Sequence, residues 1–121
     1  MQFMLCFRET DAELARRTSA EAPAYWGAWN AYIGAMRDAG IIVSGNALEP
    51  PHTGTVVRVL DGQRQVVDGP FADSKESLGG YFIVEVPDAD AALTWAARSP
   101  SAAAGSVEVR PVLVMAAPPQ P

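Results

Sequence analysis

The chain has 121 residues and a formal net charge of −5, because 14 acidic side chains outnumber nine lysines and arginines. Its length suits one domain with a sizeable core, and its acidic balance argues against a nucleic-acid surface, which needs clustered basic residues. No apolar run approaches the ~20 residues of a membrane span, and the N-terminus lacks the features of a signal peptide. We therefore expect a cytoplasmic protein with one domain at residues 1–116 and a fraying proline-rich tail at 117–121.

The first elements are predicted to be a strand and a possible short helix. The alternation of Phe3, Leu5 and Phe7 with other residues indicates a strand over residues 2–8. Thr10 and the glutamate three residues later have the spacing of a capping box. This segment opens either a short helix that ends at Arg17 or a solvated connector.

A long helix is predicted over residues 21–39. Pro23 suits its first turn, and Gly40 suits the position just after its C-terminus. Aromatic and apolar residues recur there at helical spacing, which is more typical of a core stripe than of a ligand site. These residues are Tyr25, Trp29, Tyr32, Ile33 and Met36.

The middle of the chain is predicted to hold a buried strand at residues 41–44 and an irregular loop at residues 45–54, which contains Pro50-Pro51. Residues 55–60 and 65–67 then form the two strands of a hairpin. Its turn is at Asp61-Gly62, a dipeptide suited to positive φ.

The last third predicts a strand at residues 81–86, a helix from Asp88 or Asp90 to Arg98, and a final strand at residues 107–115. We expect Ala89, Leu93 and Ala96 on the inner face of that helix and Ser99-Pro100 at its end. The element order is that of an α+β ferredoxin-like sandwich, with an antiparallel sheet and two main helices on one face.

Strand alternation assigns residues to the two faces of this sheet. The helix-facing set is Phe3, Leu5, Phe7, Phe82, Val84, Val86, Val107 and Val109. The opposite surface, here called the bare face, comprises Met4, Cys6, Arg8, Tyr81, Ile83, Glu85, Glu108 and Arg110. A soluble monomer rarely exposes a mixed apolar patch of this size. A two-fold homodimer that covers the patch is therefore expected.

Residues 67–82 contain an unusual turn, which we expect to join two strands of one sheet. An aspartate in a turn normally accepts the N–H two residues later. For Asp68 that residue is Pro70, which has no N–H. The carboxylate must bond to Phe71 N–H, find another partner or face solvent. Asp68 is therefore either a functional carboxylate or a residue that holds the loop.

Asp68-Gly69-Pro70-Phe71, followed by Leu78 to Phe82, resembles the signature of the DGPF proteins in the YCII-related superfamily. Segments along nearly the whole chain fit the resemblance in order, including residues 39–42, 48–50, 96–98 and 105–111. The resemblance implies a dimeric α/β barrel, and it implies a pocket faced by a histidine and an aspartate. Asp68 matches that aspartate. The histidine does not carry over, because the main helix offers Trp29-Asn30-Ala31.

Asp68 is accordingly the candidate catalytic residue, since burial can raise a carboxylate pKa toward neutrality and make it a base. Tyr81, Arg110 and Arg8 are candidate ligand-binding residues for an anionic or polar molecule. No cofactor motif or metal-ligand spacing is present. His52, the only histidine, is expected to be an exposed loop residue.

Three functions remain open. The first is a small-molecule enzyme or binding protein whose cleft lies at the dimer interface near Asp68. The second is a regulatory interaction protein, since proteins resembling this one are often encoded beside extracytoplasmic-function sigma factors. The third is a cofactor-independent monooxygenase, by analogy with other dimeric α/β barrels.

Overall fold

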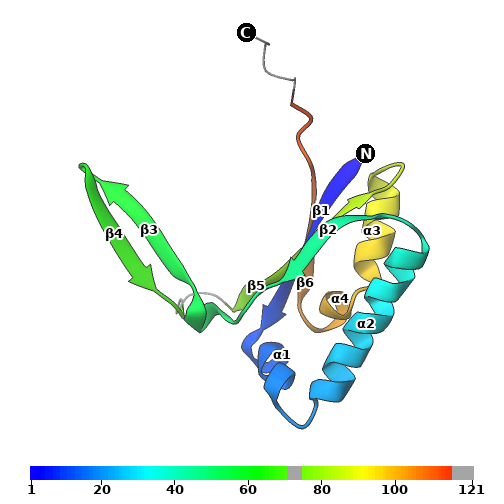
Figure 1. Cartoon of the computed structure of the whole chain (residues 1–121), viewed down its shortest axis with the longest axis horizontal. Helices are drawn as coiled ribbons and strands as arrows, with labels where there is room; N and C mark the ends of the chain where they lie inside the picture. Colours follow the sequence, from blue (N-terminus) through cyan, green and yellow to red (C-terminus); the bar gives the residue numbers. More distant parts are fainter. Residues whose placement is uncertain (71–74, 116–121) are drawn as a thin grey trace.

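A computed structural model describes residues 1–70 and 75–115 of the chain. Its main sheet is antiparallel and has the strand order β2-β5-β1-β6 (Figure 1). The four strands are β1 (Gln2–Thr10), β2 (Ile42–Ala47), β5 (Glu76–Glu85) and β6 (Ser106–Pro111). This order, with the first strand inside and the second at an edge, confirms the α+β ferredoxin-like prediction.

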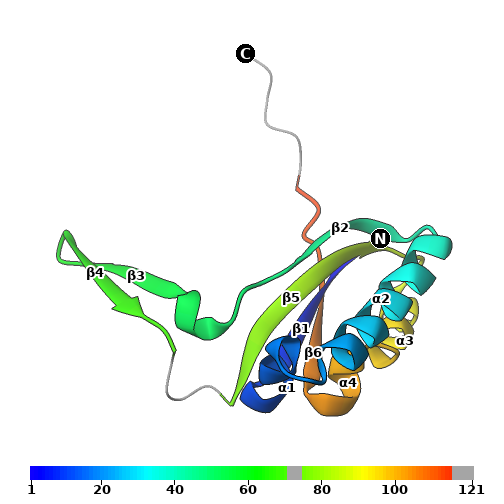
Figure 2. The same cartoon turned by 60° about the horizontal axis from the view of Figure 1, so that its bottom comes forward.

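The α-helices lie together on one side of the sheet, as Figure 2 shows. The two main ones are α2 (Ala22–Asp38) and α3 (Ala89–Ala97), and the shorter ones are α1 (Asp11–Ala15) and α4 (Pro100–Ala104). Of the two 3₁₀ segments, η1 (Arg16–Thr18) follows α1, whereas η2 (Pro51–Thr53) lies apart from the helices, beyond the end of β2. None of the described helices is long and apolar enough to cross a membrane.

Local capping signals fix the helix ends. The Thr10 hydroxyl accepts the Glu13 N–H at 3.2 Å and so caps the start of α1. Of the two alternatives for this segment, the short helix is therefore correct and the solvated connector is not. Asp88, not Asp90, caps α3 by accepting the Ala91 N–H at 2.9 Å. Gly40 follows α2 with a φ of 70°, a conformation that glycine adopts without steric cost.

The core lies between the sheet and α2, and it contains the predicted strand and helix stripes. Trp29 packs its ring edge-to-face on Phe7, with the ring centroids 5.0 Å apart. The predicted helix-facing set is confirmed as buried or packed against the core. The fully or nearly buried members of the core are Phe3, Leu5, Phe7, Tyr25, Trp29, Tyr32, Met36, Val84, Val86, Ala92 and Ala96.

The hairpin prediction is confirmed, but its place in the fold is not the expected one. β3 (Thr55–Leu60) and β4 (Gln63–Asp68) turn at Asp61 and Gly62, whose φ angles are 51° and 74°. They form a sheet of their own that projects from the main sheet (Figures 1 and 2). The expectation that residues 67–82 join two strands of one sheet is therefore wrong. We call this hairpin, residues 55–68, the arm.

The structure also differs from the expected burial or bounds of three other segments. The strand at residues 41–44 was expected to be buried, but β2 is an edge strand and Val43 is half exposed. Regular structure continues to Ala47 and resumes in η2, within the expected loop at residues 45–54. The predicted final strand ends at Pro111 instead of residue 115.

The phase of the second helix also differs from its prediction. Ala92 and Ala96 face the sheet, whereas Leu93 is 53% exposed and Ala89 is exposed. An alanine-rich helix has little contrast between its faces, so packing against the sheet sets its rotation. Pro100 ends α3 as expected but then starts α4, where proline at the first position is favoured. The tail at residues 117–121 lies outside the described residues.

Candidate functional site

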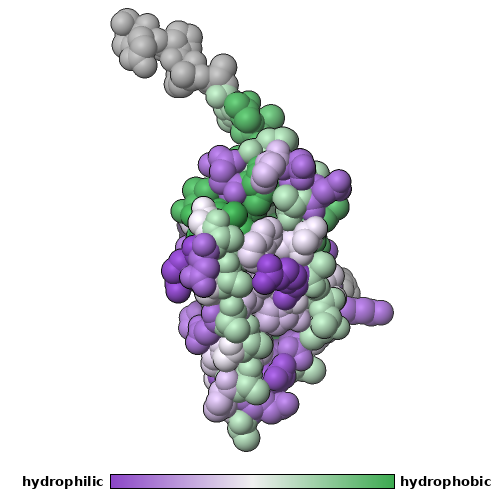
Figure 3. Space-filling model, turned by 90° about the vertical axis from the view of Figure 1, so that its right-hand side faces the viewer, coloured by the Kyte–Doolittle hydropathy of each residue, from purple (hydrophilic) through white to green (hydrophobic). Residues whose placement is uncertain are grey.

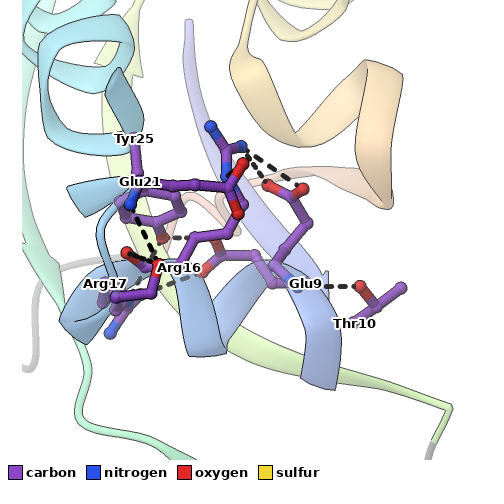
Figure 4. Close-up of polar contacts among 8 residues, drawn as sticks. Glu9, Thr10, Arg16, Arg17, Glu21 and Tyr25 are labelled. Carbon is purple, nitrogen blue, oxygen red and sulfur yellow. Dashed lines mark hydrogen bonds and ion pairs between the residues drawn. The ribbon is translucent and has the colours of Figure 1, made fainter. Parts of the chain in front are cut away.

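A buried polar network lies at the end of β1. Glu9 continues the inward alternation of Phe3, Leu5 and Phe7, and only 3% of it is exposed. Its carboxylate accepts a hydrogen bond from the Tyr25 hydroxyl of α2 (Figure 4). The second carboxylate oxygen pairs with Arg17 Nη2 at 2.9 Å. The buried charge thus has both the counter-ion and the hydrogen bonds that burial requires.

Arg17 joins this network to β5 and to the residue that follows β2. Its Nε donates to the Tyr25 hydroxyl at 3.0 Å, and its Nη1 donates to the Leu48 carbonyl at 2.6 Å. Nη2 also reaches the Gly79 carbonyl of β5 at 3.1 Å. The guanidinium lies over the Trp26 ring, 5.4 Å from its centroid. These bonds hold η1, the end of β2 and β5 together around one cation.

The Tyr25 hydroxyl stays protonated in this setting. Burial, and then its hydrogen bond to Glu9, raise the pKa of Tyr25 to about 12. At neutral pH the hydroxyl is therefore a donor to Glu9 and an acceptor from Arg17, and it does not act as a phenolate base.

A cavity of about 90 Å³ opens beside this network, between α2 and strands β1, β2 and β5. That volume has room for several water molecules or a small organic molecule. Its apolar walls are Phe7, Trp29, Ile33 and Phe82, and its polar residues are Glu9, Arg17, Tyr25, Asn30, Asn46 and Tyr81. A mostly apolar cavity with a few convergent polar groups is the usual form of a ligand site.

A wider groove of about 670 Å³ adjoins the cavity and shares Arg17, Trp26 and Ala47 with it. One of its walls is made by Pro50, Pro51 and His52 together with Pro70. His52 is exposed, as expected, and lies in this wall. The Asp-Gly-Pro turn therefore ends at the groove.

The structure separates the four residues named as site candidates. Asp68 is exposed at the base of the arm, where its Oδ1 accepts the Thr55 hydroxyl at 3.1 Å. Tyr81 lines the cavity, and its hydroxyl accepts the Asn46 side-chain amide at 3.1 Å. Arg8 pairs with Glu108 at 3.5 Å on the bare face, and Arg110 is exposed opposite Met4 on the same face.

The network of Glu9, Arg17 and Tyr25 was not anticipated from sequence. The sequence predicts Tyr25 as part of the core stripe of the main helix, which is correct for its buried ring. That prediction does not include the hydrogen bonds of its hydroxyl to Glu9 and Arg17. The inward alternation of the first strand, extended by one step, would have placed Glu9 among buried side chains. No local pattern marks Arg17. Among residues 1–70 and 75–115, no three His, Cys, Asp or Glu side chains lie together as a metal site.

Comparison with known proteins agrees with this architecture. Among solved structures, the chain is similar to 5-chloro-2-hydroxyhydroquinone dehydrochlorinase from Burkholderia phenoliruptrix AC1100, determined in complex with 2,5-dihydroxybenzoquinone. The TM-score is 0.55 at 17% identity, over 93% of this chain and 94% of that one. At that identity the likeness concerns the fold alone.

The chain is also 37% identical over 67 residues to an uncharacterised protein of Rhizobium meliloti (strain 1021). That alignment spans 54% of this chain, and it covers about half of the relative, 54% of its length. The model of the YCII-related domain matches residues 1–116. With the ferredoxin-like sheet and the Asp68-Gly69-Pro70 turn in place, this match means that the chain belongs to the family of YCII-related domain proteins.

Proposed function

We propose that this protein is a homodimer that binds or transforms a small, flat, polar molecule, with the ligand in the cavity and Asp68 at the rim of the adjoining groove. The observation that carries the proposal is the cavity itself. Aromatic walls from Phe7, Trp29 and Phe82 end at the buried cluster of Arg17, Glu9 and Tyr25.

The chemistry of the walls supports a flat ligand. Aromatic side chains favour stacked or edge-to-face neighbours, so a ring system gains more there than a flexible chain would. Arg17 and Asn30 supply hydrogen-bond donors for ring hydroxyl or carbonyl groups. The similar dehydrochlorinase has a hydroxylated ring in its complex. That likeness supports the choice of ligand class for this chain.

Asp68 is the carboxylate we propose for proton transfer. The Thr55 hydroxyl donates a hydrogen bond to one carboxylate oxygen of Asp68, and Asp68 is solvent-exposed. Asp68 does not itself line the groove, but it precedes Pro70, a residue of the groove wall, by two positions, and this proximity supports its proposed place at the rim. Tyr25 is less suited to the role of base, because its pKa is raised to about 12.

The bare face supports the homodimer. Met4, Cys6 and Ile83 are partly exposed there, beside the Arg8–Glu108 pair. Burying this face against a second copy would remove apolar surface from water at roughly 25 cal/mol per Å². The described residues offer no observation that favours the sigma-factor or monooxygenase hypotheses over this one.

Calorimetric titration with 2,5-dihydroxybenzoquinone tests the ligand class. The matched variants are Asn30→Leu, which changes a cavity residue, and Ala31→Ser, which changes its exposed neighbour outside the cavity. We expect binding to the wild type and to Ala31→Ser, and roughly tenfold weaker binding to Asn30→Leu. Equal affinity in all three proteins, or no binding to the wild type by this quinone or its hydroquinone, would overturn the proposal.

A further inference from the structure

Among the described residues, 1–70 and 75–115, the arm has no covering partner. All twelve residues of β3 and β4 are exposed, and within that part of the chain their only extensive packing is against each other. Six of them are large aliphatic residues with exposed fractions from 38% to 69%. In Figures 1 and 2 the arm points away from both the main sheet and the helices.

Both faces of the arm carry these aliphatic residues. The cross-strand register pairs Val57 with Val66 on one face and Val56 with Val67 on the other. Val59 and Leu60 lie toward the tip, on opposite faces. A two-stranded hairpin on its own is marginally stable in water and needs a third strand or a packing surface. A partner that covers one face would leave half of these side chains in water. The arm therefore needs a partner surface that contacts both of its faces.

The base of the arm holds it in a defined direction. Gly69 N–H donates to the Gly54 carbonyl at 2.8 Å, which closes the arm just beyond the Thr55–Asp68 hydrogen bond. The Thr53 hydroxyl and N–H both donate to the Pro50 carbonyl, at 2.7 and 3.0 Å. A side chain at Gly69 would collide with the Pro51 carbonyl, so the turn packs closely on η2.

We propose that the arm of each protomer docks on a second copy of this chain, so that the homodimer is fastened by two exchanged arms as well as by the bare face. This proposal rests on the proposed homodimer and extends it. The first reason is that the bare face, where Met4 and Ile83 are partly exposed, is also left uncovered by the described residues. A single two-fold association covers both surfaces.

Charge gives the second reason for a second copy as the occupant. The strands of the arm carry two cations, Arg58 and Arg64, whereas its two acids are Asp61 in the turn and Asp68 at the base, so the arm as a whole is neutral. The net charge of −5 therefore lies on the rest of the chain, and the two arginines of the strands would meet an acidic body on the partner. Glu85 and Glu108 are exposed acids of the bare face, where they pair with the N-terminal ammonium and with Arg8.

The outer surface of the helices is a less suitable interface for a second copy than the arm and the bare face. Figure 3, which views the molecule from that side, shows hydrophilic residues interspersed with weakly hydrophobic ones over most of the surface. The strongly hydrophobic residues gather near the end from which the C-terminal segment leaves.

Arm exchange has a consequence for the groove. One groove wall is formed by η2, which precedes the arm in the chain, and by Pro70, which follows it. Docking of the arm on the partner would therefore hold this wall and Asp68 in place. The groove is then complete only in the dimer.

The test compares Val57→Arg/Val66→Arg, which charges one face of the arm, with the single variant Leu93→Arg on α3. Leu93 is a matched control because it is also an aliphatic residue about half exposed, but it lies on the helix side. Sedimentation equilibrium across micromolar concentrations gives the dimer dissociation constant. We expect it to rise at least ~100-fold in the arm variant and to stay within about twofold in Leu93→Arg. Far-UV circular dichroism confirms that both proteins are folded.

Hydrogen exchange on the unmodified chain locates the interface without any substitution. Backbone amides of the arm should be protected in the dimer and lose that protection on dilution to monomer, whereas amides of β1 and β5 stay protected. A dimer whose arm amides exchange freely, or whose dissociation constant is unchanged in the arm variant, would overturn arm exchange alone. A monomeric wild type would overturn both arm exchange and the homodimer, and neither outcome bears on quinone binding to the cavity.

Discussion

Gly79 of β5 and Glu9 of β1 occupy adjoining space, such that a Cβ atom at Gly79 would lie 2.9 Å from Glu9 Cδ and 3.2 Å from Arg17 Nη2. The absence of a side chain at residue 79 is therefore what lets the buried Glu9–Arg17 ion pair form. A glycine inside a strand often marks a close approach of this kind.

Gly79→Ala should destabilise the protein by roughly 3 kcal/mol, because the new methyl group displaces a buried carboxylate from its counter-ion. Gly27→Ala is the control, since nothing lies within 4 Å of its Cβ position on α2. That variant should gain up to about 1 kcal/mol through helix propensity. Urea denaturation measures both, and a neutral Gly79→Ala would show that the ion pair is not confined by β5.

Tyr25→Phe should cost about 1–3 kcal/mol at neutral pH, because Glu9 loses a buried hydrogen-bond donor. It should also change the alkaline behaviour. The pKa of Tyr25 is raised from 10.0 to about 12, so the native state holds this proton more tightly than the unfolded state does. Its stabilising effect is complete below pH 10 and is lost as pH rises toward 12, by roughly 2–3 kcal/mol in total. Parallel pH–stability curves for wild type and Tyr25→Phe above pH 10 would contradict the assignment.

Trp29→Ala should lower the free energy of unfolding by roughly 3–5 kcal/mol, since the ring packs on Phe7 and Tyr32 in the core. Trp26, one turn earlier on the same helix, is 37% exposed and provides the comparison. Trp26→Ala should cost about 1 kcal/mol, mainly through its contact with Arg17. Similar losses in the two variants, measured by chemical denaturation, would mean that the core does not centre on Trp29.

Asp68→Asn and Asp68→Ala should each change stability by no more than about 0.5 kcal/mol, because the residue and its bond to Thr55 are solvent-exposed. Both variants should lose whatever ligand conversion the wild type performs, and Asp68→Asn should keep the ligand affinity better because it retains an acceptor oxygen. The readouts are thermal denaturation and titration with 2,5-dihydroxybenzoquinone. Unaltered ligand handling in both variants, with a marked stability loss in Asp68→Ala, would assign Asp68 to the scaffold.

Ile83→Asp should convert the proposed dimer to monomer at micromolar concentration, because it places a charge at the centre of the bare face. Light scattering gives the mass directly. Leu93→Asp, on the helix side, should remain dimeric. If Ile83→Asp has the mass of the wild-type dimer, then the bare face is not the interface.

Local sequence patterns determined most of the elements of this protein. The alternation of Phe3, Leu5 and Phe7 and the helical stripe through Trp29 each predict one buried face, because period 2 and period 3.6 follow from backbone geometry alone. Thr10, Asp61-Gly62 and Gly40 mark element ends for similarly local reasons, since each satisfies a backbone hydrogen bond or a φ angle within a few residues.

Tertiary structure decided the features that depend on residues far apart in the chain. Glu9, Arg17 and Gly79 meet only because β1 and β5 pair with a shift beside Gly79, and no local periodicity encodes that encounter. The exposure of β2 follows from its position at the sheet edge, and the rotation of α3 follows from its packing. The arm has the same explanation: the local sequence specifies its turn and register, whereas its separation from the main sheet depends on how Gly69 and Pro51 pack at its base.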